Sequence, residues 1–416
     1  MSRTVSTTLG EGDRVALLVP GSLDYLDAVL GLLAAGVVPI PLDPRLTAYE
    51  RERILTPLSP ALVVTSAAEL DRVRAAYPDT RGLPRARPVH CTSGTTGTPK
   101  GVWSGLLSAE DARALVAEER SLWSFVDTDV NLVLSPLHHS APLRFAMGTA
   151  LAGGRVVVPG PFDPALVTAA IEAERPTSMF CVPTHLQRLF AHWDEVGVPD
   201  LSSFRLVAHA GAPCPDAVKR RLVELFPAGS TWEFYGSTEG QFTACRSEEW
   251  LERPGTVGRA RPGRTLSVDP DGTIWCTVPR FARFSYFGDP DKTAATWRGD
   301  AFTVGDLGRL DEDGYLHLDG RREDLVISGG VNVYPLEVEQ VLQGHPGVDD
   351  VAVYGVPDEQ WGQRVCAAYV GTASAAELDA FVRERLAPPK RPKTWHRLEE
   401  LPRTLTGKVL RSDLPR

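Results

Sequence analysis

The sequence has few features that would attach the chain to a membrane or to nucleic acid. Its six cysteines lie far apart and form no C-x-x-C pair, which argues against a zinc site or a disulfide framework. The formal net charge is -9 and no run of Lys or Arg stands out, so we expect no nucleic-acid partner. The longest apolar run, 28–42, is broken by glycines and prolines, and the N-terminus lacks the apolar core of a signal peptide. We therefore expect a cytoplasmic protein with no membrane span.

What the sequence does contain is a regular alternation of strand-like and helical patterns. Apolar runs at 14–20 and 37–42 flank a helical pattern at 22–36, and the same order returns between 155 and 236. This alternation predicts an α/β fold with parallel sheets covered by helices on both faces. The 416 residues, 43% of them hydrophobic, suit one large domain followed by a smaller one.

The pattern changes at about residue 253. Short alternating runs are then separated by Gly, Pro and Asp turns, as in 267–278 and 308–321, which predicts antiparallel hairpins in a small barrel-like part. A compact α+β unit follows. We place the boundary at Glu323, between an N-terminal domain at 1–322 and a small mobile C-terminal domain at 323–416.

One helix of the C-terminal unit has clear start and stop signals. Ser374 and Glu377 have the spacing of a capping box, in which each side chain bonds the backbone N–H of the other residue. Pro388 and Pro389 cannot continue a helix, so we expect them to end it.

The stretch CTSGTTGTPKG, residues 91–101, combines hydroxyl side chains, glycines and one lysine after a predicted strand. Bare backbone N–H groups, hydroxyl donors and Lys100 together suit a polyphosphate. A Walker loop is excluded, because it needs Ser or Thr directly after the lysine, and here Pro99 precedes Lys100 and Gly101 follows it. Taken alone, the stretch is better explained as a flexible Gly/Thr surface turn, since short motifs match by chance.

A second motif, FYGSTEG at 234–240, follows another predicted strand. Tyr235 could stack on a purine, Thr238 could donate to a phosphate, and the hard carboxylate oxygens of Glu239 suit Mg²⁺. The alternative is a strand terminus with a solvated turn.

Two further segments add candidate ligands. Asp306 offers two oxygens that could accept both hydroxyls of a ribose, and Arg321 ends the same predicted hairpin. Lys408 follows a glycine in a terminal loop. The alternatives are a turn cap for Asp306, a surface ion pair for Arg321 and simple solvation for Lys408.

Together these motifs resemble the adenylate-forming superfamily, which includes acyl-CoA synthetases, the adenylation domains of nonribosomal peptide synthetases and firefly luciferases. The resemblance runs from GDRVALLVP at residue 12 to the Lys408 loop, with the motifs in family order. It implies ATP-dependent activation of a carboxylic acid to acyl-AMP with release of pyrophosphate, followed by transfer to the thiol of coenzyme A. It also implies that Mg²⁺ is needed, and that the C-terminal domain swings about a hinge between the two steps.

The resemblance assigns residues to each role. Catalysis falls to Lys408, Glu239 and His139, with Glu239 also as the metal ligand. The nucleotide-binding residues are Thr92, Ser93, Gly94, Thr95, Thr96, Gly97, Lys100, Gly211, Ala212, Pro213, Tyr235, Gly236, Thr238, Asp306 and Arg321. The hinge is Glu323, and Gly329 and Gly330 line the pantetheine tunnel.

The acid is expected near PLHHSAP, residues 136–142, and the predicted acyl-pocket residues are His138, His139, Arg144 and His209. These polar side chains favour an aryl or otherwise polar acid over a long fatty chain. His139 is expected in the pocket wall, with a packed core histidine as the alternative, and not as a general base, because the acid is already ionised at neutral pH.

The chain is shorter than is usual in the family in two places. The block before GDRVA and the segment between VVTS and the phosphate loop are short, so the N-terminus is expected to be shortened and a homodimer could cover the gap.

The sequence ends at Arg416 without an appended carrier domain, so we expect an external acceptor. The alternative to coenzyme A is the phosphopantetheine arm of a carrier protein. A non-catalytic nucleotide-binding relative would be expected to have lost Glu239 or Lys408.

Overall fold

The computed structural model describes residues 9–92, 100–211, 214, 216–321, 326–333, 335–402 and 409–416. The first elements are β1 (Arg14–Leu17), α1 (Leu23–Ala34), β2 (Val38–Pro41), α2 (Ala48–Leu58), β3 (Leu62–Val64) and α3 (Ala67–Ala76). The three strands form a parallel sheet in the order β2-β1-β3. Helix α1 follows the expected pattern, and its start is capped by Ser22, whose side chain accepts the N–H of Tyr25.

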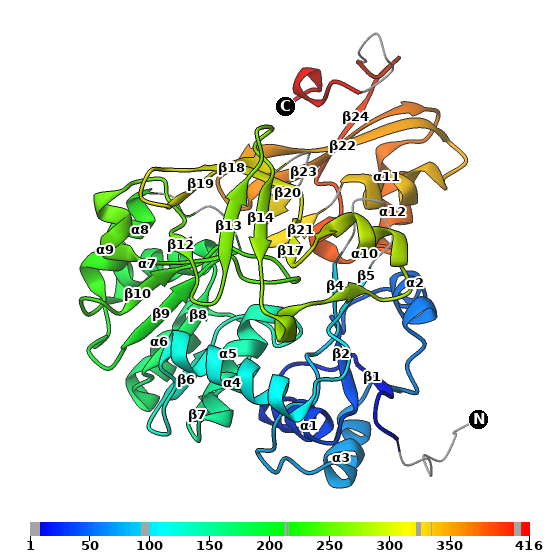
Figure 1. Ribbon diagram of the computed structural model, residues 1–416. Helices are drawn as coiled ribbons and strands as arrows, with labels where there is room; N and C mark the ends of the chain where they lie inside the picture. The colour runs from blue at the N-terminus through cyan, green and yellow to red at the C-terminus, as the bar shows by residue number, and fades with distance from the viewer. Residues whose placement is uncertain are drawn as a thin grey trace.

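A seven-stranded sheet lies on the left side of the molecule in Figure 1. Its strands are β6 (Val130–Val133), β7 (Arg155–Val157), β8 (Ser178–Cys181), β9 (Leu206–His209), β10 (Thr231–Glu233), β11 (Thr243–Arg246) and β12 (Arg259–Ala260). The associated helices are α4 (Ala109–Trp123), α5 (Ser140–Leu151), α6 (Pro164–Glu174), α7 (Pro183–Val196), α8 (Asp216–Leu225) and α9 (Ser247–Glu252). The order is β12-β11-β10-β9-β8-β6-β7, parallel from β10 to β7 and antiparallel at β11 and β12.

Helices cover both faces of this sheet, as the alternation predicted. In β8, Met179 belongs to the core formed with α6, α7 and α8, whereas the next residue, Phe180, belongs to an aromatic core with Trp123 of α4 and Phe145 of α5. Successive strand side chains point to opposite faces, so two cores require helices on two sides. Helix α5 also contributes Leu143 to the core of the three-stranded sheet, and therefore lies between the two sheets.

Short antiparallel sheets form the barrel-like part. Their strands are β4 (His90–Thr92), β5 (Lys100–Trp103), β13 (Thr265–Val268), β14 (Ile274–Thr277), β15 (Ser285–Tyr286), β16 (Trp297–Arg298), β17 (Ala301–Phe302), β18 (Asp306–Leu310) and β19 (Leu316–Arg321), with η1 (Arg280–Ala282) and α10 (Pro290–Thr296) between them. Three separate sheets, β15-β5-β4, β13-β14-β17-β16 and β18-β19, share one core that contains Val102, Cys276 and Leu316. Both predicted hairpins are present, as β13-β14 and β18-β19.

The C-terminal elements lie together at the top of Figure 1. They are β20 (Val326–Ser328), β21 (Val331–Val333), α11 (Pro335–Gln343), β22 (Val348–Asp358), β23 (Gly362–Gly371), α12 (Ala375–Arg383), η2 (Pro388–Lys390), β24 (Thr394–Arg397) and η3 (Arg411–Asp413). No helix in the described ranges has both the length and the apolar character needed to cross a membrane.

The start of helix α12 confirms one sequence prediction and its end corrects another. The capping box of Ser374 and Glu377 is present. The helix ends at Arg383, well before Pro388, so the prolines do not terminate it. They begin η2 instead, where a missing N–H is tolerated in the first turn.

Candidate active site

The phosphate-loop candidate is held by two paired strands. Residues 93–99, which include the predicted Ser93, Gly94, Thr95, Thr96 and Gly97, lie outside the described residues, but the flanking strands β4 and β5 are antiparallel, with Thr92 opposite Lys100. The Nζ of Lys100 forms an ion pair with Asp289. Asp289 also caps α10 by accepting the N–H of Lys292, so the end of the loop is fixed to the start of that helix.

The FYGSTEG motif forms a tight turn after β10. Gly236 bridges to Gln241, and the N–H of Ser237 donates to the carbonyl of Gly240 at 2.9 Å. A Cβ on Gly236 would lie 2.7 Å from the Cα of Gln241, so only glycine fits where the two backbones meet. The turn places Thr238 and Glu239 side by side at its tip.

Glu239 is positioned by groups that the sequence did not reveal. Its side chain is buried, and its Oε1 accepts a hydrogen bond of 2.8 Å from the hydroxyl of Tyr286. Among the described residues, no hydrogen bond reaches its second carboxylate oxygen. Burial lowers the pKa of nearby Lys292, and the negative charge of Glu239 partly offsets that shift. A buried carboxylate with one oxygen fixed and the other unused suits a hard cation such as Mg²⁺.

Tyr235 connects this motif to Asp306, the residue predicted to bind the ribose. Its hydroxyl donates to Oδ2 of Asp306 at 2.6 Å, and its ring packs against Phe242 with centroids 5.0 Å apart. Asp306 is buried and is paired in register with Arg321 across the β18-β19 hairpin. The fold therefore brings Tyr235, Asp306 and the backbone of Arg321 together; the side chain of Arg321 lies outside the described part.

The histidines of PLHHSAP form a neutral cluster ahead of α5. The rings of His138 and His139 are 4.4 Å apart, and Nδ1 of His90 lies 3.2 Å from the carbonyl oxygen of His138. Burial lowers the pKa of both His90 and His138 to about 3. Solvent reaches the ring of His139, but desolvation by surrounding protein still lowers its pKa. All three rings are therefore uncharged at neutral pH.

His209 belongs to a separate buried group. Its Nδ1 is 4.0 Å from Oε1 of Glu233, which forms an ion pair with Lys219 of α8. Burial lowers the pKa of His209 to about 4, so this ring is also neutral.

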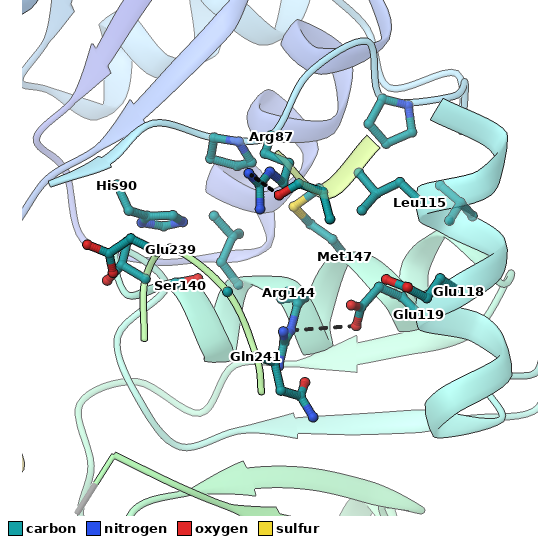
Figure 2. A pocket seen from close by; sticks show the side chains of 18 of the residues that line it. Arg87, His90, Leu115, Glu118, Glu119, Ser140, Arg144, Met147, Glu239 and Gln241 are labelled. Carbon is teal, nitrogen blue, oxygen red and sulfur yellow. Dashed lines mark hydrogen bonds and ion pairs between the residues drawn. The ribbon is translucent and has the colours of Figure 1, made fainter. Parts of the chain in front are cut away.

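A cavity of about 160 Å³ lies between α4, α5 and the segment before β4 (Figure 2). One end is formed by Thr238 and Glu239, and the wall includes Arg144. The cavity is not lined by His138, His139 or His209. It is lined by Arg87 and Arg261, two residues that the sequence analysis did not single out.

The two tunnel candidates lie where the C-terminal part meets the large domain. Gly329 and Gly330 have positive φ angles of 58° and 77°. A Cβ on Gly330 would lie 3.4 Å from a methyl group of Val182 and 3.7 Å from the hydroxyl of Thr184, both at the start of α7. Gly211 is described as well, with a φ of 91°. The predicted residues Ala212, Pro213, Glu323 and Lys408 and the side chain of Thr92 lie outside the described residues.

A buried ionic contact joins the same two parts of the chain. Oε1 of Glu50 in α2 accepts the N–H of Ala387 at 2.8 Å and lies 3.7 Å from Nζ of Lys390. Lys390 also pairs with Glu337 of α11 at 2.9 Å. Burial alone would lower the pKa of Lys390, but the two carboxylates outweigh it and raise the pKa.

Comparison with known proteins agrees with these features. The family model for AMP-binding enzymes matches residues 5–87 and 89–278, and that for the C-terminal domain of AMP-binding enzymes matches 337–408. A feruloyl-CoA synthase from Amycolatopsis sp is 34% identical over 458 residues, covering 97% of this chain and 89% of that protein.

Two solved structures of the o-succinylbenzoate CoA synthetase of Bacillus subtilis are similar to this chain, one more closely than the other. A double mutant with a product analogue, OSB-NCoA, gives a TM-score of 0.87 at 28% identity, covering 98% of this chain and 89% of that one. The complex with the acyl-adenylate OSB-AMP gives 0.66 at 27% identity, covering 97% and 88%. Identity and coverage are nearly equal in the two comparisons, so the overall structure of this chain is more similar to the first structure than to the second. The chain therefore belongs to the AMP-binding enzyme family and is an ATP-dependent acid–thiol ligase.

Proposed function

We propose that the residues of this site divide acid-CoA ligation between two steps. In the first, a carboxylate oxygen of the acid attacks the α-phosphorus of ATP, and the bond to pyrophosphate breaks. The loop at 91–101 holds the phosphates, and Asp306 with Arg321 holds the ribose. Glu239 would hold Mg²⁺, which supplies positive charge beside the departing pyrophosphate. Lys408 joins the two anions as charge moves between them.

The arrangement around Glu239 carries this proposal. Lys292 interacts electrostatically with both Glu239 and Lys100, so positive groups from β5 and α10 meet the carboxylate at the base of the phosphate loop. Fixed charges in a partly buried site require little reorganisation during reaction, and stabilise developing charge better than solvated ones. No protein nucleophile is required, because ATP supplies the electrophile and the acid attacks it directly.

In the second step, the thiol of coenzyme A attacks the acyl carbonyl and AMP leaves. We assign the hinge to Glu323, at the boundary between domains 1–322 and 323–416, and the pantetheine path to Gly329 and Gly330. The close approach of Gly330 to Val182 supports this assignment, as does the similarity to the structure with a CoA product analogue. His139 is not among the residues that line the cavity beside Glu239, so its place beside the acyl group stays a prediction.

The test is pyrophosphate release with ATP, Mg²⁺ and a panel of acids, with mass spectrometry of the products. We expect acyl-CoA when coenzyme A is supplied. A carrier protein presents the same pantetheine thiol, so a phosphopantetheinylated carrier is tested in parallel, and preference for it would replace coenzyme A as the acceptor. Pyrophosphate release with no thioester from either acceptor would contradict the second step.

Homodimerisation stays a prediction, which light scattering would test. The cytoplasm is the proposed compartment, because ATP and coenzyme A are the co-substrates.

Replacing Glu50 by alanine is expected to slow thioester formation from supplied acyl-adenylate about tenfold, while adenylate formation changes little. Oε1 of Glu50 holds the C-terminal part in the arrangement observed here. A hydrogen bond to a charged group contributes about 1.5–3 kcal/mol, enough to shift the balance between two domain arrangements by about this factor. Rapid-quench measurement of each step separates the two effects.

Thr47→Ala is the matched control for this prediction. Thr47 and Glu50 form the capping box of α2, so Glu50→Ala also removes a helix cap. Thr47→Ala breaks the same cap, at a cost of about 1 kcal/mol, but leaves the contact between Glu50 and Ala387. If both variants slow thioester formation equally, the effect arises from α2 and not from domain docking.

A further inference from the structure

The cavity beside Glu239 has more positive than negative side chains in its wall. Its charged lining residues are Arg87, Arg120, Arg144, Arg261 and Arg264 against Glu118, Glu119 and Glu239. Arg120 is exposed, so four guanidinium groups face three carboxylates in the covered part of the wall, an excess of one positive charge, and the carboxylate of Glu239 is assigned to the metal. Buried charge that is not neutralised is costly, so a cavity with this excess favours an anionic ligand.

Two of the arginines form close ion pairs with carboxylates, although Nε and Nη2 of Arg261 make no hydrogen bond within the described residues. Arg264 donates two hydrogen bonds to Glu118, at 2.6 and 3.0 Å, and Arg261 bonds Glu119 at 3.0 Å and lies 3.1 Å from Glu118. This group ties α4 to the segment after β12. Glu118 is fully engaged by this group, and Glu119 is shared between Arg261 and Arg144.

Arg87 forms no ion pair within the described residues, and Arg144 forms only a long one, with Glu119. Arg87 donates to the carbonyl oxygens of Ala282 and Arg283 at 3.4 and 3.2 Å, and no carboxylate of the described residues lies within ion-pair distance of it. Burial lowers its pKa to about 10, which leaves it charged at neutral pH. Arg144 is 3.6 Å from Oε2 of Glu119, and within the described part of the chain its buried Nε makes no hydrogen bond. Figure 2 shows Arg87 and Arg144 on opposite sides of the cavity.

The rest of the wall is mostly apolar and the space is small; its uncharged polar residues are His90, Ser140, Ser237, Thr238 and Gln241. Leu115, Leu143 and Met147 face the cavity, together with side chains of the barrel-like part such as Phe302. The volume of about 160 Å³ is close to that of an engineered cavity, about 150 Å³, which holds benzene. A space of this size suits one ring or a short chain better than a long fatty acyl group.

We propose that this cavity receives the acid substrate, and that the substrate is a dicarboxylic acid of about the size of one ring. One carboxylate lies at the Glu239 end, where adenylation occurs. The second lies between Arg87 and Arg144 and neutralises the excess charge. This inference rests on the proposed function, because it identifies the acid that the same site activates.

The experiment compares matched acids by kcat/KM for pyrophosphate release from the full-length enzyme with ATP, Mg²⁺ and coenzyme A. The panel is benzoate, 3-carboxybenzoate, 4-carboxybenzoate, 3-hydroxybenzoate and decanoate. We expect at least one carboxybenzoate to exceed benzoate by about tenfold or more, since an unpaired buried polar group penalises the analogue that lacks its partner. A kcat/KM for benzoate or 3-hydroxybenzoate equal to that for both carboxybenzoates would overturn this inference, while the ligase function would still stand. No turnover with any acid, these or a wider set, would count against both.

Three variants separate recognition from folding. Arg144→Leu and Arg87→Met are each expected to lower kcat/KM for the carboxybenzoate about 100-fold, with less than about threefold change for benzoate. Glu119→Gln adds to the positive excess and is expected to raise the preference for the dicarboxylic acid. Arg155→Leu, at an exposed ion pair with Glu174, is the control. The proposal would be contradicted if the arginine variants lowered kcat/KM equally for the carboxybenzoate and for benzoate. It would also be contradicted if Glu119→Gln lowered the preference for the carboxybenzoate over benzoate.

Discussion

Replacing Lys408 by alanine is expected to reduce acyl-adenylate formation by about 10²- to 10³-fold, the cost of removing one preorganised charge-stabilising donor. The acid and the α-phosphate are both anions, and Lys408 is the cation assigned to both. Once the adenylate exists, this repulsion is absent, so thioester formation from supplied acyl-AMP should be nearly unchanged. Pyrophosphate release measures the first step, and mass spectrometry of the acyl thioester measures the second.

Lys393→Ala is the matched control. Lys393 is an exposed lysine of the same C-terminal part, where Nζ donates to the carbonyl of Pro388 at 2.9 Å. Its loss removes one positive charge from the domain without touching the proposed site, so both steps should proceed normally. If Lys408→Ala instead loses both steps to the same degree, the assignment of Lys408 to the first step alone is wrong.

Replacing Gly330 by leucine is expected to have the opposite effect, with adenylate made normally and thioester formation reduced by about 100-fold or more, as in other cases where a blocked path stops a conformational step. The Cβ would already contact Val182 at 3.4 Å and Thr184 at 3.7 Å, so a longer side chain must occupy the space between the two parts of the chain. The expected signature is acyl-AMP that accumulates on the enzyme.

Gly330→Ala separates the effect of backbone strain from the effect of a bulky side chain. The φ of 77° strains any residue with a Cβ, so alanine introduces the strain with little added volume. We expect alanine to slow thioester formation far less than leucine does, with the thermal midpoint of both variants measured alongside. Normal thioester turnover in Gly330→Leu would remove Gly330 from the pantetheine path.

Local patterns in the sequence were sufficient for the elements and for several contacts. The capping box of Ser374 and Glu377 forms from residues three apart, and the register of Asp306 with Arg321 follows from one hairpin. The end of α12 was misjudged because prolines exclude a helix but do not require one to continue up to them.

Contacts between distant segments had no such local signal. Tyr286 reaches Glu239 from a short strand of the barrel-like part, and Lys292 approaches from the following helix. The D-P-D-K run at 289–292 indicates a helix start, but nothing in it shows which carboxylate the helix faces. The docking of Glu50 against Ala387 spans even more of the chain and depends on how the two parts are arranged.

The sequence by itself determined the order of the elements, the motif residues and the family, because periodicity, capping and short motifs are read from neighbouring residues. Only the tertiary structure decided which groups surround Glu239 and what the acid cavity contains. Arg87, Arg144 and Arg261 each look like ordinary charged residues in the sequence. Their shared cavity, and its excess of positive charge, exists only because α4, α5 and the barrel-like part pack around one space.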